Sequence, residues 1–128
     1  ASIINEGNDV TIVSFGAGIH WAIEVLSRNP IISADLIDLR SLQPLDTETI
    51  FNSVKKTSKC IILQEDTLFG GIASDISALI MENCFEYLDA PVRRVGSIES
   101  PIPFVKSLED QYLPKNRFET ELISLLNY

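Results

Sequence analysis

Short apolar runs and longer amphipathic segments alternate along this chain, and this order constrains the fold most strongly. Residues 10–15, 34–39 and 60–63 are rich in aliphatic side chains, which is typical of strands buried on both faces. The segments between these runs are long enough to form helices. Because parallel strands need such helical crossovers, the sequence predicts an α/β fold in which a mainly parallel sheet is covered on both faces, a three-layer α/β/α sandwich.

Residues that start or stop a helix mark the expected helix boundaries. One helix is expected from about residue 20 to residue 28, before Asn29-Pro30. A second helix begins after Pro44-Leu45-Asp46, where Asp46 is a good N-terminal cap. A third helix follows Gly70-Gly71, and its apolar residues recur at helical spacing: Ile72, Ile76, Leu79, Ile80 and Cys84.

The last third of the chain is expected to add one strand and one helix. Asp89-Ala90-Pro91 breaks the preceding helix, and residues 92–95 form a short strand. A Pro-rich loop follows, with Pro101 and Pro103, and a helix after Pro114 carries one apolar face, made of Phe118, Leu122, Leu125 and Leu126. Since the chain has 128 residues and shows no linker or repeat, we expect a single domain over residues 1–128.

The composition argues against several classes of function. The formal net charge of −8 disfavours nucleic acid and anionic lipid as main partners and suits a basic protein partner. No apolar run approaches the roughly 20 residues that span a membrane, and the first residues are not those of a signal peptide. Cys60 and Cys84 are interpreted as buried, reduced thiols. The missing initiator Met is compatible with a processed chain or with a fragment of a longer one.

A glycine-rich turn suggests a nucleotide site that the next residues disfavour. Gly16 and Gly18 follow a strand and open a helix, and Asp38 ends the next strand, as in a dinucleotide-binding fingerprint. The third glycine position is Trp21, whose indole would prevent close packing of helix and strand. A free-standing nucleotide-binding α/β module is therefore an alternative, and a tight structural turn is the favoured interpretation.

Three more polar residues are candidates for subunit or ligand contacts. His20, the only histidine, could act as a base, but spacing identifies no nucleophile for it. Arg40 follows a strand and could meet an anion or brace Asp38 or Asp46. Glu65 and its neighbour Asp66 could chelate Mg²⁺ as in phosphoacceptor receiver domains, but those domains carry their acid pair after the first strand, where this chain has Ser14-Phe15-Gly16. No cluster of His and Cys has metal-ligand spacing. The residues alone therefore predict no catalytic, cofactor-binding or metal site.

Several segments resemble a known family. Residues 7–13, 35–46, 53–57 and 65–71 are similar to the transketolase C-terminal domain, which transketolases and deoxyxylulose-phosphate synthases share in part. Residues 85–95, 101–104 and 108–114 narrow the resemblance to beta subunits of 2-oxo acid dehydrogenases, of the pyruvate or branched-chain 2-oxoisovalerate type. An origin in a transketolase or deoxyxylulose-phosphate synthase stays an alternative.

The resemblance implies a fold and a parent reaction. It implies a five-stranded mixed sheet whose first strand, at about residues 1–5, runs antiparallel. It also implies a parent enzyme in which thiamine diphosphate and Mg²⁺ support decarboxylation of a 2-oxo acid and the acyl group passes to a lipoyl group. In that family the pyrophosphate motif belongs to the alpha half and the activating Glu to the preceding domain of the beta half. The isolated chain is therefore expected to be inactive.

The resemblance further implies a role in assembly and docking. The partners would be the alpha and beta halves of a heterotetramer and the basic subunit-binding domain of the lipoyl acyltransferase. Asp89 corresponds to a docking residue of relatives, and Glu86 and the carboxylate of Tyr128 are expected to contribute. Asp89 could instead only cap the chain before Pro91. The parent would work in the cytoplasm of a bacterium or in the mitochondrial matrix of a eukaryote, and its 2-oxo acid cannot be chosen from these residues.

Overall fold

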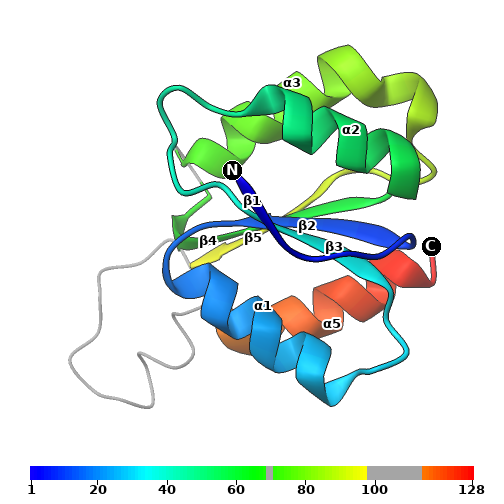
Figure 1. Ribbon diagram of the computed structural model, residues 1–128. Coiled ribbons are helices and arrows are strands. Elements are labelled where there is room, and N and C mark those ends of the chain that lie inside the picture. Colours follow the sequence, from blue (N-terminus) through cyan, green and yellow to red (C-terminus); the bar gives the residue numbers. More distant parts are fainter. Residues whose placement is uncertain (69–70, 98–113) are drawn as a thin grey trace.

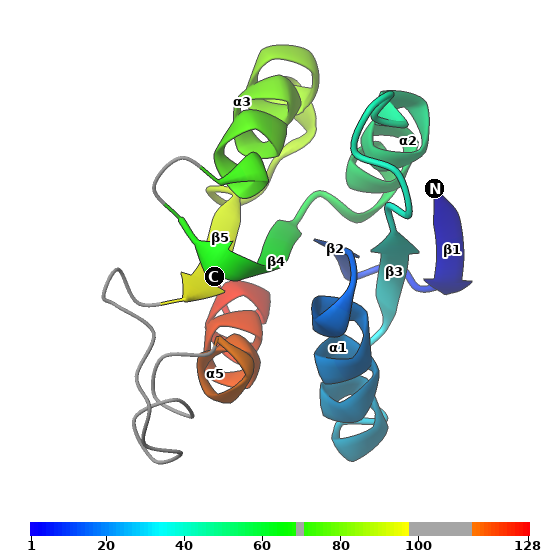
Figure 2. The same cartoon turned by 90° about the vertical axis from the view of Figure 1, so that its left-hand side faces the viewer.

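The computed structural model describes residues 1–68, 71–97 and 114–128, without the side chain of residue 116. Within these residues, five strands form one sheet in the order β1-β3-β2-β4-β5 (Figures 1 and 2). β1 pairs antiparallel with β3, and the other neighbours pair parallel. The strands are β1 (Ser2–Asn5), β2 (Val10–Ser14), β3 (Ala34–Asp38), β4 (Cys60–Thr67) and β5 (Arg93–Ser97). The mixed sheet with an antiparallel first strand is confirmed.

Helices cover both faces of the sheet. α1 (Ala17–Arg28) and α5 (Lys115–Leu126) lie on one face, and α2 (Thr47–Thr57) and α3 (Ile72–Cys84) lie on the other (Figure 1). Each face has its own cluster of buried apolar side chains, and the sheet contributes to both. The three-layer α/β/α sandwich is therefore confirmed, because strands that are apolar on both sides need a helical layer on each.

Several boundaries differ from those expected; β5, for example, runs from Arg93 to Ser97 and not over residues 92–95, and two further differences have a physical cause. α1 begins at Ala17, three residues early, because Gly16 adopts a φ of 59° and turns the chain directly into the helix. β4 continues to Thr67, beyond the apolar run, and a bulge lets Thr67 pair with Ser97.

Other local predictions hold or need correction. Asp46 caps α2, since its carboxylate accepts a hydrogen bond of 3.1 Å from the backbone N–H of Thr49. α3 ends at Cys84 and passes into a short 3₁₀ turn, η1 (Phe85–Tyr87), so the break comes earlier than Asp89. Cys60 and Cys84 are free and buried, as expected. The Pro-rich loop with Pro101 and Pro103 lies outside the described residues.

A buried carboxylate joins three parts of the fold. Asp35, on β3, is only 1% exposed. It accepts hydrogen bonds from the backbone N–H of Gly7 at 2.9 Å, from Ser53 Oγ at 2.7 Å and from Lys56 Nζ at 2.8 Å. These donors come from the turn before β2 and from α2. One acceptor therefore fixes α2 and that turn against β3, as a buried charge must be compensated by donors.

The same network makes stability depend on pH. Burial by itself raises the pKa of Asp35, but hydrogen bonds from Lys56, Ser53 and Gly7 outweigh it and hold the pKa below the ordinary value of 3.8. The unfolded chain therefore takes up a proton at higher pH than the folded chain does. The stabilising contribution is complete above the unfolded pKa and is lost as pH falls through the lower folded pKa.

Replacing Asp35 by Asn should remove much of this dependence. We expect Asp35→Asn to lower the free energy of unfolding at pH 7 by about 1–3 kcal/mol, because the charged acceptor is lost. Urea unfolding between pH 7 and pH 3 should then show a smaller loss of stability than in the wild type. The exposed Asp75→Asn is the matched control. An unchanged acid dependence in Asp35→Asn would contradict this account of the network.

Gly18 is required by the close approach of α1 to the sheet. A Cβ atom at Gly18 would lie 2.1 Å from Ser14 Oγ, which donates a hydrogen bond of 2.6 Å to the Leu63 carbonyl. The side chain of Ser14 is buried and cannot move aside without losing that bond. The glycine is therefore explained by packing between α1, β2 and β4.

This contact predicts a non-additive pair of substitutions. We expect Gly18→Ala to destabilise the chain by about 1–3 kcal/mol through overpacking. Adding Ser14→Ala removes the clashing oxygen, so the double variant should lose less stability than the sum of the single variants in urea unfolding. Gly16→Ala is a control for backbone strain alone, since no atom lies within 4 Å of its added Cβ. Strict additivity would show that the contact is not the cause.

Candidate functional site

The polar candidates divide between two edges of the sheet. Parallel strands place all their carboxyl ends at one edge and all their amino ends at the other, and β2, β3, β4 and β5 are parallel. His20, Arg40 and Glu65 follow or end strands at the carboxyl edge. Asp89 precedes β5 and lies at the amino edge, where α5 and the chain also end (Figure 1). The two groups therefore belong to different surfaces.

At the carboxyl edge, Arg40 is held by its own neighbour. Its backbone N–H donates to Asp38 Oδ1 at 3.1 Å, and its Nε lies 3.9 Å from Asp38 Oδ2. Asp46, the other expected partner, instead binds Thr49. Arg40 is exposed and has a φ of 58°, so the ion pair with Asp38 is a loose surface contact.

The other candidates at this edge lie on separate elements. His20 is exposed in the first turns of α1, and Glu65 is exposed on β4. The carboxylate of Asp66 accepts a hydrogen bond of 2.8 Å from the backbone N–H of Thr67. Among the residues that the structure describes, no three His, Cys, Asp or Glu side chains form a group suited to a metal ion.

Both glycines of the turn before α1, Gly16 and Gly18, have a structural role. Gly16 supplies the positive φ, and Gly18 allows α1 to approach Ser14. Trp21 is partly buried and packs against the apolar cluster beneath α1. These contacts account for the Gly16-Gly18 pattern without a nucleotide.

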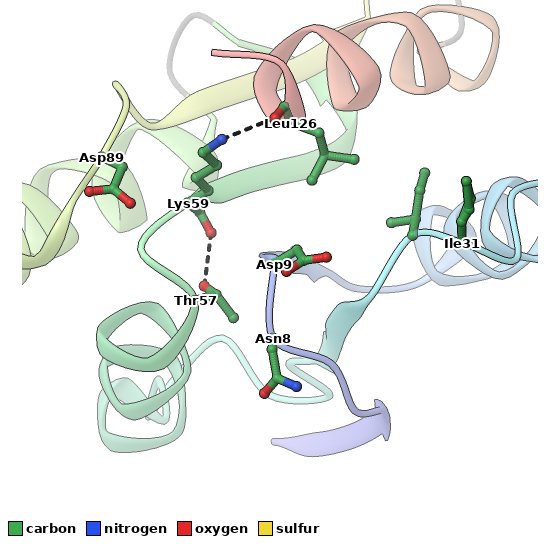
Figure 3. A pocket seen from close by; sticks show the side chains of 8 residues that line it. Asn8, Asp9, Ile31, Thr57, Lys59, Asp89 and Leu126 are labelled. Atoms are coloured by element: carbon green, nitrogen blue, oxygen red, sulfur yellow. Dashed lines mark hydrogen bonds between the residues drawn. The ribbon is translucent and has the colours of Figure 1, made fainter.

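A cleft opens at the opposite, amino edge of the sheet. Its volume is about 470 Å³, and we call it the amino-edge cleft (Figure 3). It is formed by the residues that precede four parallel strands and by the end of α5: Asn8, Asp9, Ile31, Ile32, Thr57, Lys59, Asp89 and Leu126. Among these residues only Asp89 was expected to contact a partner, and that expectation came from the family resemblance. The remaining lining residues are brought together by the sheet and not by any local pattern.

Hydrogen bonds fix the walls of this cleft. The backbone N–H of Asp89 donates to the Ser58 carbonyl at 2.8 Å. Lys59 Nζ donates to the Leu126 carbonyl at 3.1 Å, and Thr57 Oγ1 donates to the Lys59 carbonyl at 3.0 Å (Figure 3). The segment before β5 and the last turn of α5 are therefore tied to the segment before β4.

The three expected docking residues lie around this end of the molecule. Asp89 lines the cleft, and Tyr128 follows Leu126 by two residues and is 67% exposed. Glu86 is exposed on η1, three residues before Asp89. Asp89 is bound to its neighbours through its backbone, and its carboxylate makes no hydrogen bond to the residues described. The cleft thus presents acidic groups beside the end of α5.

Comparison with known proteins identifies the family. Residues 1–117 match the family described as the transketolase, C-terminal domain. The pyruvate dehydrogenase E1 component subunit beta of Rickettsia felis is 38% identical over 130 residues, which cover 100% of this chain and 40% of that protein. The mitochondrial 2-oxoisovalerate dehydrogenase subunit beta of Dictyostelium discoideum is 42% identical over 117 residues, which cover 89% of this chain and 31% of that protein.

A solved structure agrees with these relatives. A split gene transketolase, described as an inactive beta4 tetramer, superposes with a TM-score of 0.81 and 26% identity, over 98% of this chain and 41% of that one. The chain spans at most about two fifths of the length of the relatives named here. It therefore belongs to the transketolase C-terminal domain family, and its relatives include beta subunits of pyruvate and 2-oxoisovalerate dehydrogenases.

Proposed function

We propose that this chain is the C-terminal part of the beta subunit of a thiamine-diphosphate-dependent 2-oxo acid dehydrogenase, where it serves subunit assembly and docking of the lipoyl acyltransferase. The parent would decarboxylate pyruvate or a branched-chain 2-oxo acid oxidatively and transfer the acyl group to lipoyl. The similarity to the pyruvate and 2-oxoisovalerate dehydrogenase beta subunits supports the parent enzyme. The amino-edge cleft, with Asp89 beside the end of α5, is the observation that supports docking.

Catalysis is assigned to other parts of the parent. Thiamine diphosphate and Mg²⁺ would supply the decarboxylation chemistry. The family resemblance assigns the pyrophosphate motif to the alpha half and the activating Glu to the preceding domain of the beta half, so we propose no catalytic step for this chain. The part of this chain in the reaction is to hold the assembly together and to bring the acyl acceptor to it.

Electrostatics supports a basic docking partner. The chain carries 18 acidic and 10 basic residues, and acidic side chains lie at the amino-edge cleft and on η1. A partner that presents Arg or Lys would be steered by this charge and would form charge-assisted hydrogen bonds with the Asp89 and Tyr128 carboxylates. The subunit-binding domain of the acyltransferase is a partner of that kind.

An apolar groove along the first strand supports the assembly role. β1 is the outermost strand of the sheet, and Ile3 and Ile4 are more than two fifths exposed. Ile4, Ile23, Leu26 and Leu36 contribute to a hollow of about 320 Å³ between β1 and α1. An uncharged edge strand beside an apolar hollow is a surface that another subunit can cover. The alpha and beta halves of the parent are the expected occupants.

The cellular place follows from the proposed parent. Relatives from Dictyostelium discoideum are named mitochondrial. We place the parent in the mitochondrial matrix if the source is eukaryotic and in the cytoplasm if it is bacterial. None of the helices in the described part of the chain has the length and apolar character needed to cross a bilayer.

Docking is tested by titration against the subunit-binding domain of the cognate acyltransferase. We expect binding that weakens with added salt, and at least about a tenfold loss of affinity in Asp89→Ala, because a charge-assisted contact is removed. Asp75→Ala is the matched control, since Asp75 is an exposed carboxylate in the first turn of α3, at the opposite edge of the sheet.

The titration is made with the chain alone and with the assembled alpha–beta enzyme. Binding only to the assembled enzyme would mean that docking needs the paired subunits. If the assembled enzyme does not bind, or if Asp89→Ala binds as tightly as the wild type in both forms, the docking role of this cleft is wrong.

A further inference from the structure

Asp9 places a second carboxylate in the amino-edge cleft. It precedes β2 and is exposed, and its backbone N–H donates to the Ser33 carbonyl at 2.8 Å. In the sheet order, β4 lies between β2 and β5, so Asp9 and Asp89 belong to strands that are two positions apart. Since neighbouring strands are spaced by about 4.8 Å, the backbones of β2 and β5 lie roughly 10 Å apart, and Asp9 and Asp89 precede strands on the two sides of β4. Figure 3 shows Lys59 between them.

Lys59 leaves both carboxylates open to a partner. It is the one basic residue among the described residues that line the cleft. Its ammonium donates to the Leu126 carbonyl, at the C-terminal end of α5, where backbone carbonyls favour a cation. No ion pair joins it to Asp9 or Asp89 within the described part of the chain. The Lys59 ammonium thus holds the end of α5, and the carboxylates of Asp9 and Asp89 are exposed to solvent.

An apolar surface, formed by Ile31 and Ile32, extends the cleft on the side of Asp9. Ile31 is 84% exposed, and the turn that carries it is fixed by a hydrogen bond of 3.0 Å from the Ile32 N–H to the Asn29 carbonyl. Ile32 and Leu126 line the same cleft and are partly buried. A single exposed isoleucine is ordinary on a protein surface, but here it continues an apolar wall beside two carboxylates.

We propose that Asp9 and Ile31 are specificity-determining residues of the docking cleft, and that the partner presents one cationic side chain to Asp89, a second one to Asp9 and an apolar side chain to Ile31. Asp89 binds one cation and Asp9 binds the other, while the apolar side chain packs on Ile31. This inference rests on the proposed docking function. It goes further because it adds a second cation, bound by Asp9, and specifies which flank of the cleft is apolar.

The test measures binding of the acyltransferase subunit-binding domain to the assembled enzyme by calorimetry at two salt concentrations. We expect Asp9→Asn to weaken binding about 5- to 20-fold and to reduce the dependence on salt. Ile31→Ser should weaken binding about 3- to 10-fold with the salt dependence unchanged, because an apolar contact is lost. The matched controls are Asp75→Asn and Met81→Ser, which should bind like the wild type, since Met81 is 44% exposed on α3 and lines neither the amino-edge cleft nor the hollow beside β1. Unfolding temperatures verify that all variants are folded.

A double variant tests whether Asp9 and Asp89 bind two different cations of the partner or share one. If each carboxylate has its own cation, Asp9→Asn combined with Asp89→Asn loses the product of the two single fold-changes. A double variant no weaker than the weaker single variant would overturn the two-cation arrangement. If Asp89→Asn weakens binding while Asp9→Asn and Ile31→Ser do not, the inference is wrong and the docking function stands. If the wild-type enzyme does not bind the subunit-binding domain, the proposed docking function and this inference are both wrong.

Discussion

The buried carboxylate of Asp35 is the interaction on which the arrangement of this domain depends. It lies in the sheet beneath α2 and accepts three hydrogen bonds from the turn before β2 and from α2. The network continues through Thr11, whose hydroxyl lies 2.7 Å from the hydroxyls of Ser53 and Thr57. Thr57 in turn binds the Lys59 carbonyl. Contacts between polar groups therefore run from the core to the floor of the amino-edge cleft, and the three hydroxyls supply three hydrogens for these four contacts.

The two edges of the sheet have different physical characters. At the carboxyl edge, Gly18 and Gln64 have structural roles. Gly18 allows α1 to pack against Ser14, and the Gln64 side chain accepts a hydrogen bond from the Ala73 N–H and donates one to the Thr67 carbonyl. At the amino edge, backbone groups and Lys59 are used to fix the walls, and carboxylates stay exposed. Open α/β sheets commonly bind ligands at the carboxyl edge. We propose the amino edge as the interaction surface of this domain, because the amino-edge cleft brings Asp9, Asp89 and the end of α5 together there.

Sequence reasoning reached the fold because its signals are local and periodic. The runs that form β2, β3 and the first half of β4, and the cap at Asp46, could be recognised from neighbouring residues alone. β1 has no such signal, since a four-residue edge strand is set by its partner, and it was expected only from the family resemblance. The reach of β4 to Thr67 was missed because it depends on pairing with Ser97, 30 residues later.

The candidate site was only partly predictable because its residues lie far apart in the sequence. Asp89 was expected from the resemblance, but Asp9, Ile31 and Lys59 precede different strands and meet only when the sheet forms. No spacing in the chain reveals that meeting. His20, Arg40 and Glu65 were noted because they end or follow strands, and the structure places them away from the residues for which we propose a docking role. Their contribution to subunit contacts stays a prediction.

Hydrogen exchange on the assembled enzyme, with and without the acyltransferase subunit-binding domain, tests the central claim most directly. The account predicts added protection in peptides that cover residues 6–12, 29–33, 57–61 and 86–92 and the end of α5, because their backbone amides surround the amino-edge cleft. Peptides that cover residues 15–21 and 38–42, at the carboxyl edge, should exchange as before. Protection centred on the carboxyl-edge peptides, with the cleft unchanged, would contradict the account.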